Sequence, residues 1–429
     1  MRFMVPALLW TCILCGCAGA NTESTTEGLP VAGPRVIQNG SPPPQWTFFP
    51  LPSKTTTPQN IVAGPDDGNM WFIEATGSSL DKIGITTGHI KRFPTSVPLT
   101  LLGLALGPDR NLWFTGFSRS GDVIVKASTA GQFTTFSVGT KMEPAEITAG
   151  PDGNLWFTDF ATNAIGKVTT GGVVTEYSVP SGGRPYDIVL GRDGNLWFDE
   201  ENSPLIGKTT PAGIITEYPL PNPNSSTASG MTAAPDGNVW VAESAVIKGS
   251  KVFPGHHLDR VTPTGSITDY YIAGTNPFSP TSLGYGDLLY LFVDQGLATY
   301  NIRTHQFIIV GQPPNAGGSG PMTVGPDDNL WFTQSVSAQV GGQVGVYIRH
   351  VLSVSPTSLT LSVGQSGTLT ASETLETRPL TASSSNPAVA TVMSSGMNTF
   401  KVTGVAAGTC TVTVADHERN RFLVPVTVH

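Results

Sequence analysis

Cysteine is scarce in this chain, and its position limits what can hold the fold together. Four cysteines occur in 429 residues, three of them within the first 17, so only Cys410 stands in the remainder. A single thiol cannot form an internal disulfide, and the folded part must therefore be stabilised by packing. Because Cys410 lies in the alternating stretch GTCTVTV, we expect a buried, inert side chain rather than a reactive thiol.

Charge is also sparse, at 13% of residues, with a formal net charge of −8. A mildly acidic chain without clustered Lys and Arg lacks what sequence-independent binding of nucleic acid requires, so we expect no nucleic-acid partner. Gly and Pro number 49 and 35, which favours turns over long helices and predicts an all-β protein. The length exceeds what one ordinary core supports and predicts at least two domains.

The N-terminus, MRFMVPALLWTCILCGCAGA, carries one basic residue, Arg2, and an apolar run that is too short for a convincing membrane span. It has the form of a signal peptide. Leu14-Cys15-Gly16-Cys17 resembles a bacterial lipobox, which implies that residues 1–16 are a lipoprotein signal peptide and that Cys17 is lipidated. Ordinary secretory cleavage after Ala20 is the alternative.

The following segment, 17–44, is polar and rich in Pro and Gly without periodicity. We expect it to be a flexible linker between the lipid and the folded body. The protein would then be exported and held at a membrane of the bacterial cell envelope, facing the periplasm or the cell surface.

A repeated unit dominates the next 300 or so residues, which predicts a repeat architecture. GPDGNLWFTD at 150–159 returns as GRDGNLWFDE at 191 and GPDDNLWFTQ at 325. Aligning the aromatic after the turn gives spacings of 42, 43, 41, 43, 51 and 40 residues. The seven aligned positions are Trp71, Trp113, Trp156, Trp197, Trp240, Leu291 and Trp331.

Each unit has the pattern of four short strands separated by turn residues, which is the strand number and length of a β-propeller blade. We therefore predict a seven-bladed β-propeller over 45–350, in which the recurring Trp packs between neighbouring blades. The last unit lacks its outermost strand, while WTFFPLP at 46–52 matches that element. We predict that this N-terminal strand completes the last blade, near Val344 to Arg349, so that the ring has no open end.

From 351 to 429 the composition changes to Ser, Thr, Val and Ala in about seven alternating strands, which predicts an immunoglobulin-like β-sandwich. The segments VSPTSLTLSVGQ, SSNPAVATV and VTGVAAGTCTVTV resemble the bacterial immunoglobulin-like group 2 domain. This implies a spacer or adhesion module. Leu380, Thr381 and Ala382 stand where such domains often carry a tryptophan.

The units GPDGNLWFTD…NAIGKVTTGGVVTEYSVP and GRDGNLWFDE…PLIGKTTPAGIITEYPLP resemble the repeats of the virginiamycin B lyase (streptogramin lyase) family. The resemblance implies a seven-bladed propeller that opens cyclic depsipeptide antibiotics by elimination. It also implies Mg²⁺ as cofactor, with two histidines in Pro-His-x-Ile motifs entering the last two blades. Here Thr281 and Gly320 stand in those places, and neither side chain can act as the base that an elimination needs.

Other polar residues in the repeats have ordinary structural explanations. Five carboxylates occur among seven equivalent positions, three residues after the aligned aromatic: Glu74, Gly116, Asp159, Glu200, Glu243, Asp294 and Gln334. Facing the channel, they would form an acidic ring able to hold a divalent cation. We favour scaffold roles for them, turn chemistry for the Asp-Gly-Asn stretches and a surface loop for His256 and His257, and we predict no metal site.

The loops that lead into each unit vary, whereas the PDGN turns at the opposite end hardly change. Variable loops on a rigid scaffold are where binding usually occurs, so we place a ligand at the channel mouth. The candidate binding residues are Glu143, Arg184, Tyr186, Glu243 and Asp294. We expect a monomer that binds a small molecule, glycan or envelope protein, with no established cofactor. A streptogramin lyase-like enzyme is the alternative.

Overall fold

The computed structural model describes most of the chain after residue 44. The described residues are 45–53, 56–65, 67–118, 121–139, 142–221, 228–243, 246–248, 251–253, 257–272, 282–283, 287–293, 295–313, 318–327, 329–335, 341–348, 352–373, 380–415 and 421–429. All regular elements in these residues are β-strands, in agreement with the all-β prediction. No helix there has the length and apolar character needed to cross a membrane. Lipidation at Cys17, the signal peptide and the linker lie outside the described residues.

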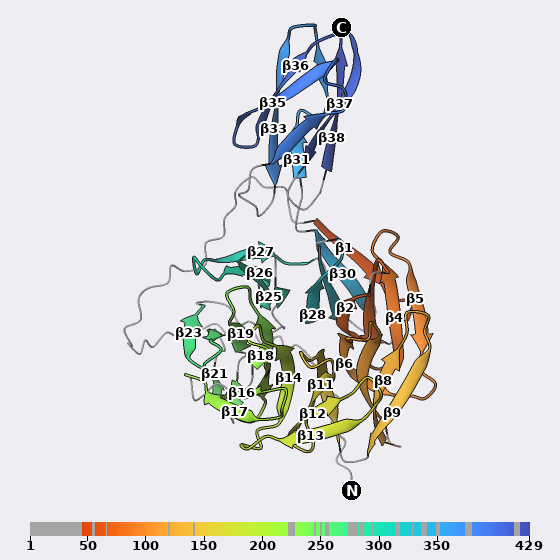
Figure 1. Ribbon diagram of the computed structural model, residues 1–429, viewed down its shortest axis with the longest axis vertical. Helices are drawn as coiled ribbons and strands as arrows, with labels where there is room; N and C mark the ends of the chain where they lie inside the picture. Colours follow the sequence, from red (N-terminus) through yellow and green to blue (C-terminus); the bar gives the residue numbers. More distant parts are fainter. Residues whose placement is uncertain are drawn as a thin grey trace. The chain divides into compact units, whose positions relative to one another are not determined.

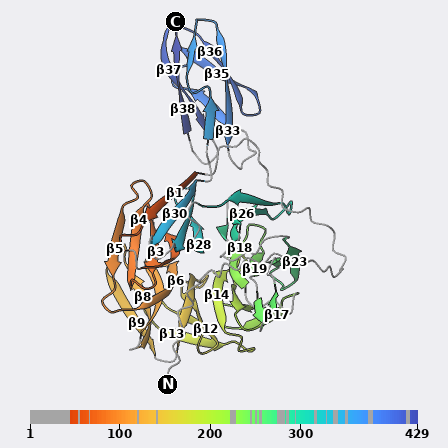
Figure 2. The same cartoon turned by 180° about the vertical axis from the view of Figure 1, so that it is seen from behind.

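The chain forms two compact units, one containing residues 46–346 and the other residues 347–429. We call the first the repeat region. Within its described residues the strands form seven four-stranded sheets and one small hairpin. Figures 1 and 2 show these sheets following one another in chain order.

The strands of the first four sheets follow the chain without interruption. Sheet 1 contains β2 (Pro58–Ala63), β3 (Asn69–Glu74), β4 (Ser79–Gly84) and β5 (Ile90–Pro94). Sheet 2 contains β6 (Thr100–Leu106), β7 (Leu112–Ser118), β8 (Gly121–Ala127) and β9 (Phe133–Gly139). Sheet 3 contains β10 (Pro144–Ala149), β11 (Leu155–Asp159), β12 (Ala164–Val168) and β13 (Val174–Ser178). Sheet 4 contains β14 (Pro185–Leu190), β15 (Leu196–Glu200), β16 (Leu205–Thr209) and β17 (Ile215–Pro219).

Of the last three sheets, the fifth and the seventh depart from this plan in one place each. Sheet 5 contains β18 (Ala228–Ala233), β19 (Val239–Glu243), β22 (His257–Val261) and β23 (Ile267–Tyr271), with the hairpin of β20 (Val246–Lys248) and β21 (Lys251–Phe253) inserted. Sheet 6 contains β24 (Ser282–Leu283), β25 (Leu288–Val293), β26 (Gly296–Asn301) and β27 (Phe307–Gly311). Sheet 7 contains β28 (Gly318–Val324), β29 (Leu330–Ser335), β30 (Gly342–Ile348) and, from the other end of the region, β1 (Gln45–Pro50).

The first strands of successive sheets pack side by side. β2 contacts β6, β6 contacts β10, β10 contacts β14, β14 contacts β18, β18 contacts β24, and β24 contacts β28. The series returns to its start because β28 also contacts β2. We call these seven the inner strands.

The recurring tryptophans are the largest fully buried side chains of the protein. Trp113 of sheet 2 packs with Ile147, Leu155 and Phe157 of sheet 3, which places the indole between neighbouring sheets. Its Nε1 donates a hydrogen bond to the turn carboxylate Asp109 at 2.9 Å. The same bond recurs at 2.9–3.2 Å at the other five repeats with a tryptophan. The PDGN turn therefore recurs because its aspartate orients the indole of the tryptophan.

A lysine opposite the tryptophan contacts the indole and the turn aspartate and also reaches the next sheet. Lys126 stands opposite Trp113 on β8, with its Nζ 5.5 Å from the indole centroid and 2.8 Å from Asp109. Equivalent lysines in sheets 3 and 4 donate to carbonyls of the following sheet, Lys167 to Pro211 O at 3.5 Å and Lys208 to Pro263 O at 3.0 Å. Each such lysine combines a cation–π contact with a bond between sheets.

A second aromatic side chain stacks on each tryptophan from the outermost strand, for example Tyr177 on Trp156 with centroids 5.6 Å apart. The far side of this ring contacts a left-handed glycine in the next sheet. A Cβ added to Gly213 would lie 1.9 Å from the ring of Tyr177. The same contact joins Phe93 to Gly131, Phe136 to Gly172 and Tyr218 to Gly265. In sheet 6, His305 takes the place of the glycine and stacks on Tyr270 at 4.7 Å.

β1 supplies the parts of this pattern that sheet 7 would otherwise lack. It lies beside β30, and Leu51 N donates to Gly342 O at 3.0 Å. Phe49 stacks on Trp331 with centroids 5.9 Å apart, and a Cβ on Gly88 of sheet 1 would lie 2.3 Å from its ring. Phe49 therefore connects sheet 7 to sheet 1 with the contact that joins the other sheets.

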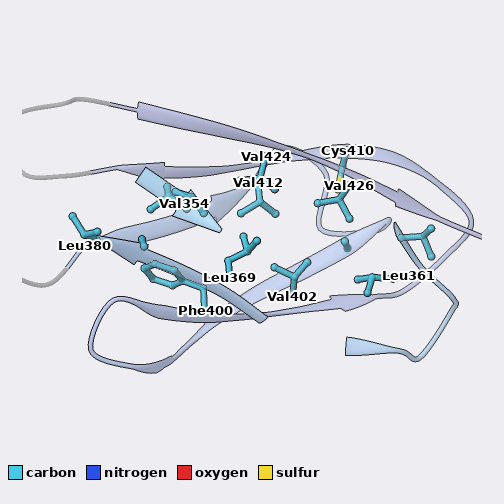
Figure 3. Close-up of a cluster of buried hydrophobic side chains, with 14 residues drawn as sticks. Val354, Leu361, Leu369, Leu380, Phe400, Val402, Cys410, Val412, Val424 and Val426 are labelled. Atoms are coloured by element: carbon cyan, nitrogen blue, oxygen red, sulfur yellow. The ribbon is translucent and has the colours of Figure 1, made fainter. Parts of the chain in front are cut away.

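The second unit is a sandwich of two four-stranded sheets. One sheet contains β31 (Leu352–Ser355), β33 (Ser366–Glu373), β36 (Thr399–Gly404) and β35 (Ala390–Gly396). The other contains β32 (Leu359–Leu361), β38 (Arg421–Val428), β37 (Gly408–Ala415) and β34 (Thr381–Ser384). Figure 3 shows the core between them, with Phe400 as its large aromatic side chain and Leu380 at one edge. Cys410 is a free, buried cysteine in this core.

Candidate functional site

The inner strands carry a β-bulge at which the repeats stop resembling one another. In sheet 3, Pro144 pairs with Asp159 and Ile147 with Phe157, so two residues of β10 oppose one of β11. The same shift occurs in five other inner strands. The second bulge residue is, in sheet order, Asn60, Gly103, Glu146, Asp187, Gly230 and Pro321. A position that changes this freely is not dictated by the scaffold.

Four polar side chains gather around these bulges, and we call Asn60, Glu146, Asp187 and Asp199 the inner cluster. Asn60 Nδ2 donates to Glu146 Oε2 at 2.6 Å and to Leu102 O at 3.0 Å, so it spans from sheet 1 to sheet 3. The glycine at 103 makes this possible, because a Cβ there would lie 2.5 Å from Ala145 O.

Asp187 connects the cluster to sheet 5. Its Oδ2 accepts a hydrogen bond from Met231 N at 3.0 Å, and its own backbone N–H donates to Asp199 Oδ1 at 2.6 Å. Threonine fills the position of Asp199 in sheets 2 and 3, where Thr158 Oγ1 accepts from Glu146 N and donates to Tyr186 O. Sheet 4 thus replaces a neutral hydroxyl with a second acid next to Asp187.

Burial and mutual repulsion favour the protonated forms of these acids. Burial, followed by the charges of Asp187 and Asp199, raises the pKa of Glu146 to about 8 despite the hydrogen bond from Asn60. Burial raises the pKa of Asp187, and burial together with Asp187 raises that of Asp199. Glu146 and Asp187 keep part of their surface exposed although protein surrounds them, whereas Asp199 is fully buried. Perturbed carboxyls open to solvent are a feature of functional sites.

Beside the inner cluster lies a second group, which we call the rim cluster: Phe160, Arg184, Tyr186 and Glu201. The Arg184 guanidinium lies 3.4 Å from the Phe160 centroid and 3.6 Å from Glu201 Oε2. Tyr186 packs edge-to-face on Phe160 at 6.2 Å and is 43% exposed. Burial, with Glu146 as the next cause, raises the pKa of Tyr186. Since Tyr186 immediately precedes Asp187 on β14, the two clusters are continuous.

The structure brings two of the five sequence-predicted binding residues together, Arg184 and Tyr186, which both contact Phe160. Glu143 is connected to this pair by its backbone, since the Phe160 N–H donates to Glu143 O at 3.1 Å. Glu243 lies elsewhere, inside sheet 5, with 1% of its surface exposed. Asp294 lies outside the described residues, so its place at the site stays a prediction.

The acidic positions after each aligned aromatic do not form an exposed ring. Glu74, Asp159, Glu200 and Glu243 are all buried. Glu74 pairs with Arg92 at 2.7 Å, and Asp159 accepts hydrogen bonds from the backbone N–H groups of residues 143, 161 and 162. Glu200 accepts from Ser181 and Ser203. These contacts are scaffold roles.

Glu243 has a different partner, a second buried acid. Asp259 stands beside it on β22, and burial followed by Glu243 raises the pKa of Asp259 to about 10. None of the four carboxyl oxygens has a hydrogen-bond partner among the described residues, so a proton retained on Asp259 relieves the repulsion between the two acids. Among the described residues, no three His, Cys, Asp or Glu side chains are grouped so that they could hold a metal ion. The described residues thus offer no group of three such ligands for the Mg²⁺ that the family resemblance implies.

We expect Asp259→Asn to stabilise the repeat region at pH 8 and to change its stability little at pH 4. Below about pH 4 both the folded and the unfolded states hold the Asp259 proton. Between about pH 4 and 10 only the folded state holds it, so the free energy of unfolding falls as pH rises, by at most about 1.4 kcal/mol per pH unit. Urea unfolding followed by tryptophan fluorescence measures this, since residues 351–429 contain no tryptophan.

Asp152→Asn is the control with the opposite sign. Burial acts against ionisation of Asp152, but hydrogen bonds from Trp156 and Asn154 outweigh it and lower the pKa of that carboxyl. Its contribution is therefore present above the unfolded pKa and is lost on acidification, so the substitution should destabilise more at pH 8 than at pH 4. Equal pH profiles for the two variants would contradict the retained proton on Asp259.

Comparison with known proteins shows what the repeat region is similar to. Residues 35–248, which include sheets 1 to 4 and part of sheet 5, match the virginiamycin B lyase family. Residues 351–426 match the bacterial Ig-like domain of group 2, so both sequence resemblances are confirmed. No curated protein matches the chain.

Solved structures support the same assignment and show that the repeat region has a propeller fold. A streptogramin B lyase is 25% identical with a TM-score of 0.62, and the match covers 71% of this chain and 98% of that one. A catalytically inactive histidine-to-alanine variant of virginiamycin B lyase from Staphylococcus aureus, solved with quinupristin, is 23% identical with a TM-score of 0.62 and coverages of 71% and 99%.

A third similar structure includes more of the chain at lower identity. It is the extracellular domain assigned to a hybrid two-component system of B. thetaiotaomicron, with 14% identity, a TM-score of 0.55 and coverages of 90% of this chain and 59% of that one. This likeness concerns the fold alone.

Proposed function

We propose that the protein is an exported, lipid-anchored binding protein built on a closed, seven-bladed propeller, with the Ig-like domain as spacer or contact module. The seven four-stranded sheets and the return of β28 to β2 support the blade count. Export and the anchor rest on the N-terminal sequence and on Cys17. The ligand binds at the channel mouth formed by the rim and inner clusters.

The proposed binding site rests on one observation. The residues that differ from their counterparts in the other repeats lie close together in the structure. Glu146, Asp187 and Asp199 replace neutral or small residues of other sheets, and they lie directly beside the exposed Tyr186. A scaffold gains nothing from crowding acids whose charged forms are disfavoured, so the arrangement favours a role in recognition.

The alternative function is the lyase activity of the family, acting on a streptogramin or a related depsipeptide. The family match and the two lyase structures favour it. Against it stands the first bulge residue of the inner strands, where the resemblance places histidine. In the six inner strands with a described bulge this residue is Gln59, Leu102, Ala145, Tyr186, Ser229 and Gly320. The position in sheet 6 and Thr281 lie outside the described residues.

We expect the full-length protein to release no linearised product from a streptogramin B antibiotic in the presence of Mg²⁺, measured by liquid chromatography and mass spectrometry. A lyase of the family serves as positive control. Binding is measured separately, by thermal shift against a library of small molecules. A hit should lose its shift in Arg184→Ala and Tyr186→Ala, and keep it in Tyr271→Ala, which removes another exposed tyrosine, on the outer strand β23. Linearised product would overturn the binding-only assignment.

A further inference from the structure

We propose that the rim and inner clusters recognise a polyhydroxylated ligand of the carbohydrate class. This inference rests on the proposed function and adds the chemistry of its ligand. It follows from three features of the clusters: an exposed aromatic ring, neighbouring polar groups that donate and accept, and a cation at the rim.

The exposed ring is Tyr186. The face of Phe160 is occupied by the Arg184 guanidinium, 3.4 Å from its centroid, so Phe160 supports the site without offering a surface of its own. Tyr186 meets Phe160 edge-to-face and leaves 43% of its surface open to solvent, which is unusual among the large aromatic side chains of the repeat region. An exposed tyrosine ring held in place by its neighbours can stack on the C–H face of a sugar ring.

The polar groups beside this ring are of both hydrogen-bonding types. Asn60 brings an amide, and Glu146 and Asp187 bring partly exposed carboxyls. Since the pKa of Glu146 is raised to about 8, this carboxyl keeps a proton near neutral pH and both donates and accepts. Vicinal hydroxyls, which also donate and accept, complement such a group. An apolar ligand would instead cover the exposed part of these groups without offering it a hydrogen-bond partner, at a cost of about 1–3 kcal/mol each.

The rim cation decides between a hydroxylated ligand and a cationic one. A cationic ligand would be drawn to Glu146 and Asp187, but stacking on Tyr186 would bring it close to Arg184, only two residues away. A neutral hydroxylated ligand meets no such repulsion and gains a further donor from the guanidinium.

The test uses the full-length protein and soluble probes of defined chemistry. Isothermal titration calorimetry is run with maltohexaose, cellohexaose, chitohexaose and hexagalacturonate, and with putrescine and spermidine as cationic probes. We expect at least one oligosaccharide to bind with a Kd between about 1 μM and 1 mM, and neither amine to bind. Tyr186→Ala should weaken oligosaccharide binding at least about tenfold, while the matched variant Tyr271→Ala leaves it unchanged.

Two substitutions at Glu146 separate hydrogen bonding from charge. The amide of Glu146→Gln still donates and accepts, so for a hydroxylated ligand this variant should bind several-fold better than Glu146→Ala. Tryptophan fluorescence confirms that each variant folds. For a cationic ligand the glutamine and alanine variants would be equally impaired, and that result overturns the proposal.

The remaining outcomes separate this inference from the proposed function. If an amine binds and loses binding in Tyr186→Ala, the carbohydrate class is wrong and the binding site stands. If an oligosaccharide binds equally well to the wild type and Tyr186→Ala, the site itself is wrong. If no oligosaccharide binds at about 1 mM, the inference is overturned whatever the library in the thermal-shift assay contains.

Discussion

Phe49→Ala lowers the free energy of unfolding of the propeller by about 2–4 kcal/mol, and this is one of the two largest effects we expect. The substitution removes the ring that stacks on Trp331 and contacts Gly88, so it loosens the junction between sheets 7 and 1. Urea unfolding followed by tryptophan fluorescence measures the change directly.

Phe49→Tyr is the matched control for this junction. Tyrosine stands in the equivalent places of sheets 3, 4 and 5, at Tyr177, Tyr218 and Tyr270. The substitution should therefore cost less than about 1 kcal/mol. If alanine and tyrosine at 49 give the same stability as the wild type, β1 contributes nothing to closure of the ring and the proposal of a sealed propeller fails.

Gly213→Ala destabilises by a similar amount, about 3 kcal/mol, for two reasons that add. The residue has a φ of +83°, which an L-side chain adopts with strain. The new methyl would also lie 1.9 Å from the Tyr177 ring, so it would push sheets 3 and 4 apart.

Gly194→Ala isolates the backbone part of that cost. Gly194 has a similar φ of +75°, but nothing lies within 4 Å of the position a Cβ would take. This variant should lose only about 1 kcal/mol, so the difference between the two measures the contact between the sheets. Equal losses of stability in the two variants would mean that the Tyr177 ring moves away from the new methyl group at no cost in free energy.

The architecture could be predicted from the sequence because each repeat contains the residues that join it to the neighbouring sheet. The turn aspartate recurs four residues before the tryptophan, and in sheets 1 to 4 a lysine follows 11 or 13 residues later. Asp109, Trp113 and Lys126 contact one another in this way in sheet 2. The glycine opposite most of the outer aromatics was not anticipated. Its role depends on the ring of the preceding sheet, 36 to 47 residues earlier, as with Tyr177 and Gly213.

The candidate site was accessible only in part. Arg184 and Tyr186 were found because they stand in variable loops or at their ends, and the structure places them together. Glu146, Asp187 and Asp199 were missed, although each breaks the repeat at an aligned position. That departure is the signal in the sequence. This signal could not be interpreted without the bulge, which places two consecutive residues of the inner strand opposite a single residue of the following strand.

Glu243 shows the opposite error. Its aligned position suggested a group at the channel mouth, yet its carboxyl lies inside sheet 5 beside Asp259. Sequence alone places a residue along a strand but does not tell which of two acids is solvated, because that depends on how tightly the neighbouring sheet packs. The raised pKa of Asp259 reports this packing.

The place where β1 meets β30 also determines how the propeller would respond to a mechanical load. The end of β1 lies beside the beginning of β30, since Leu51 bonds to Gly342, so the chain before Gln45 and the chain after Ile348 leave sheet 7 from the same end. Tension between them would peel the two strands apart one hydrogen bond at a time, instead of shearing all of them at once. A pull on the protein would thus separate β1 from β30 before it reached the proposed binding residues in sheets 3 and 4.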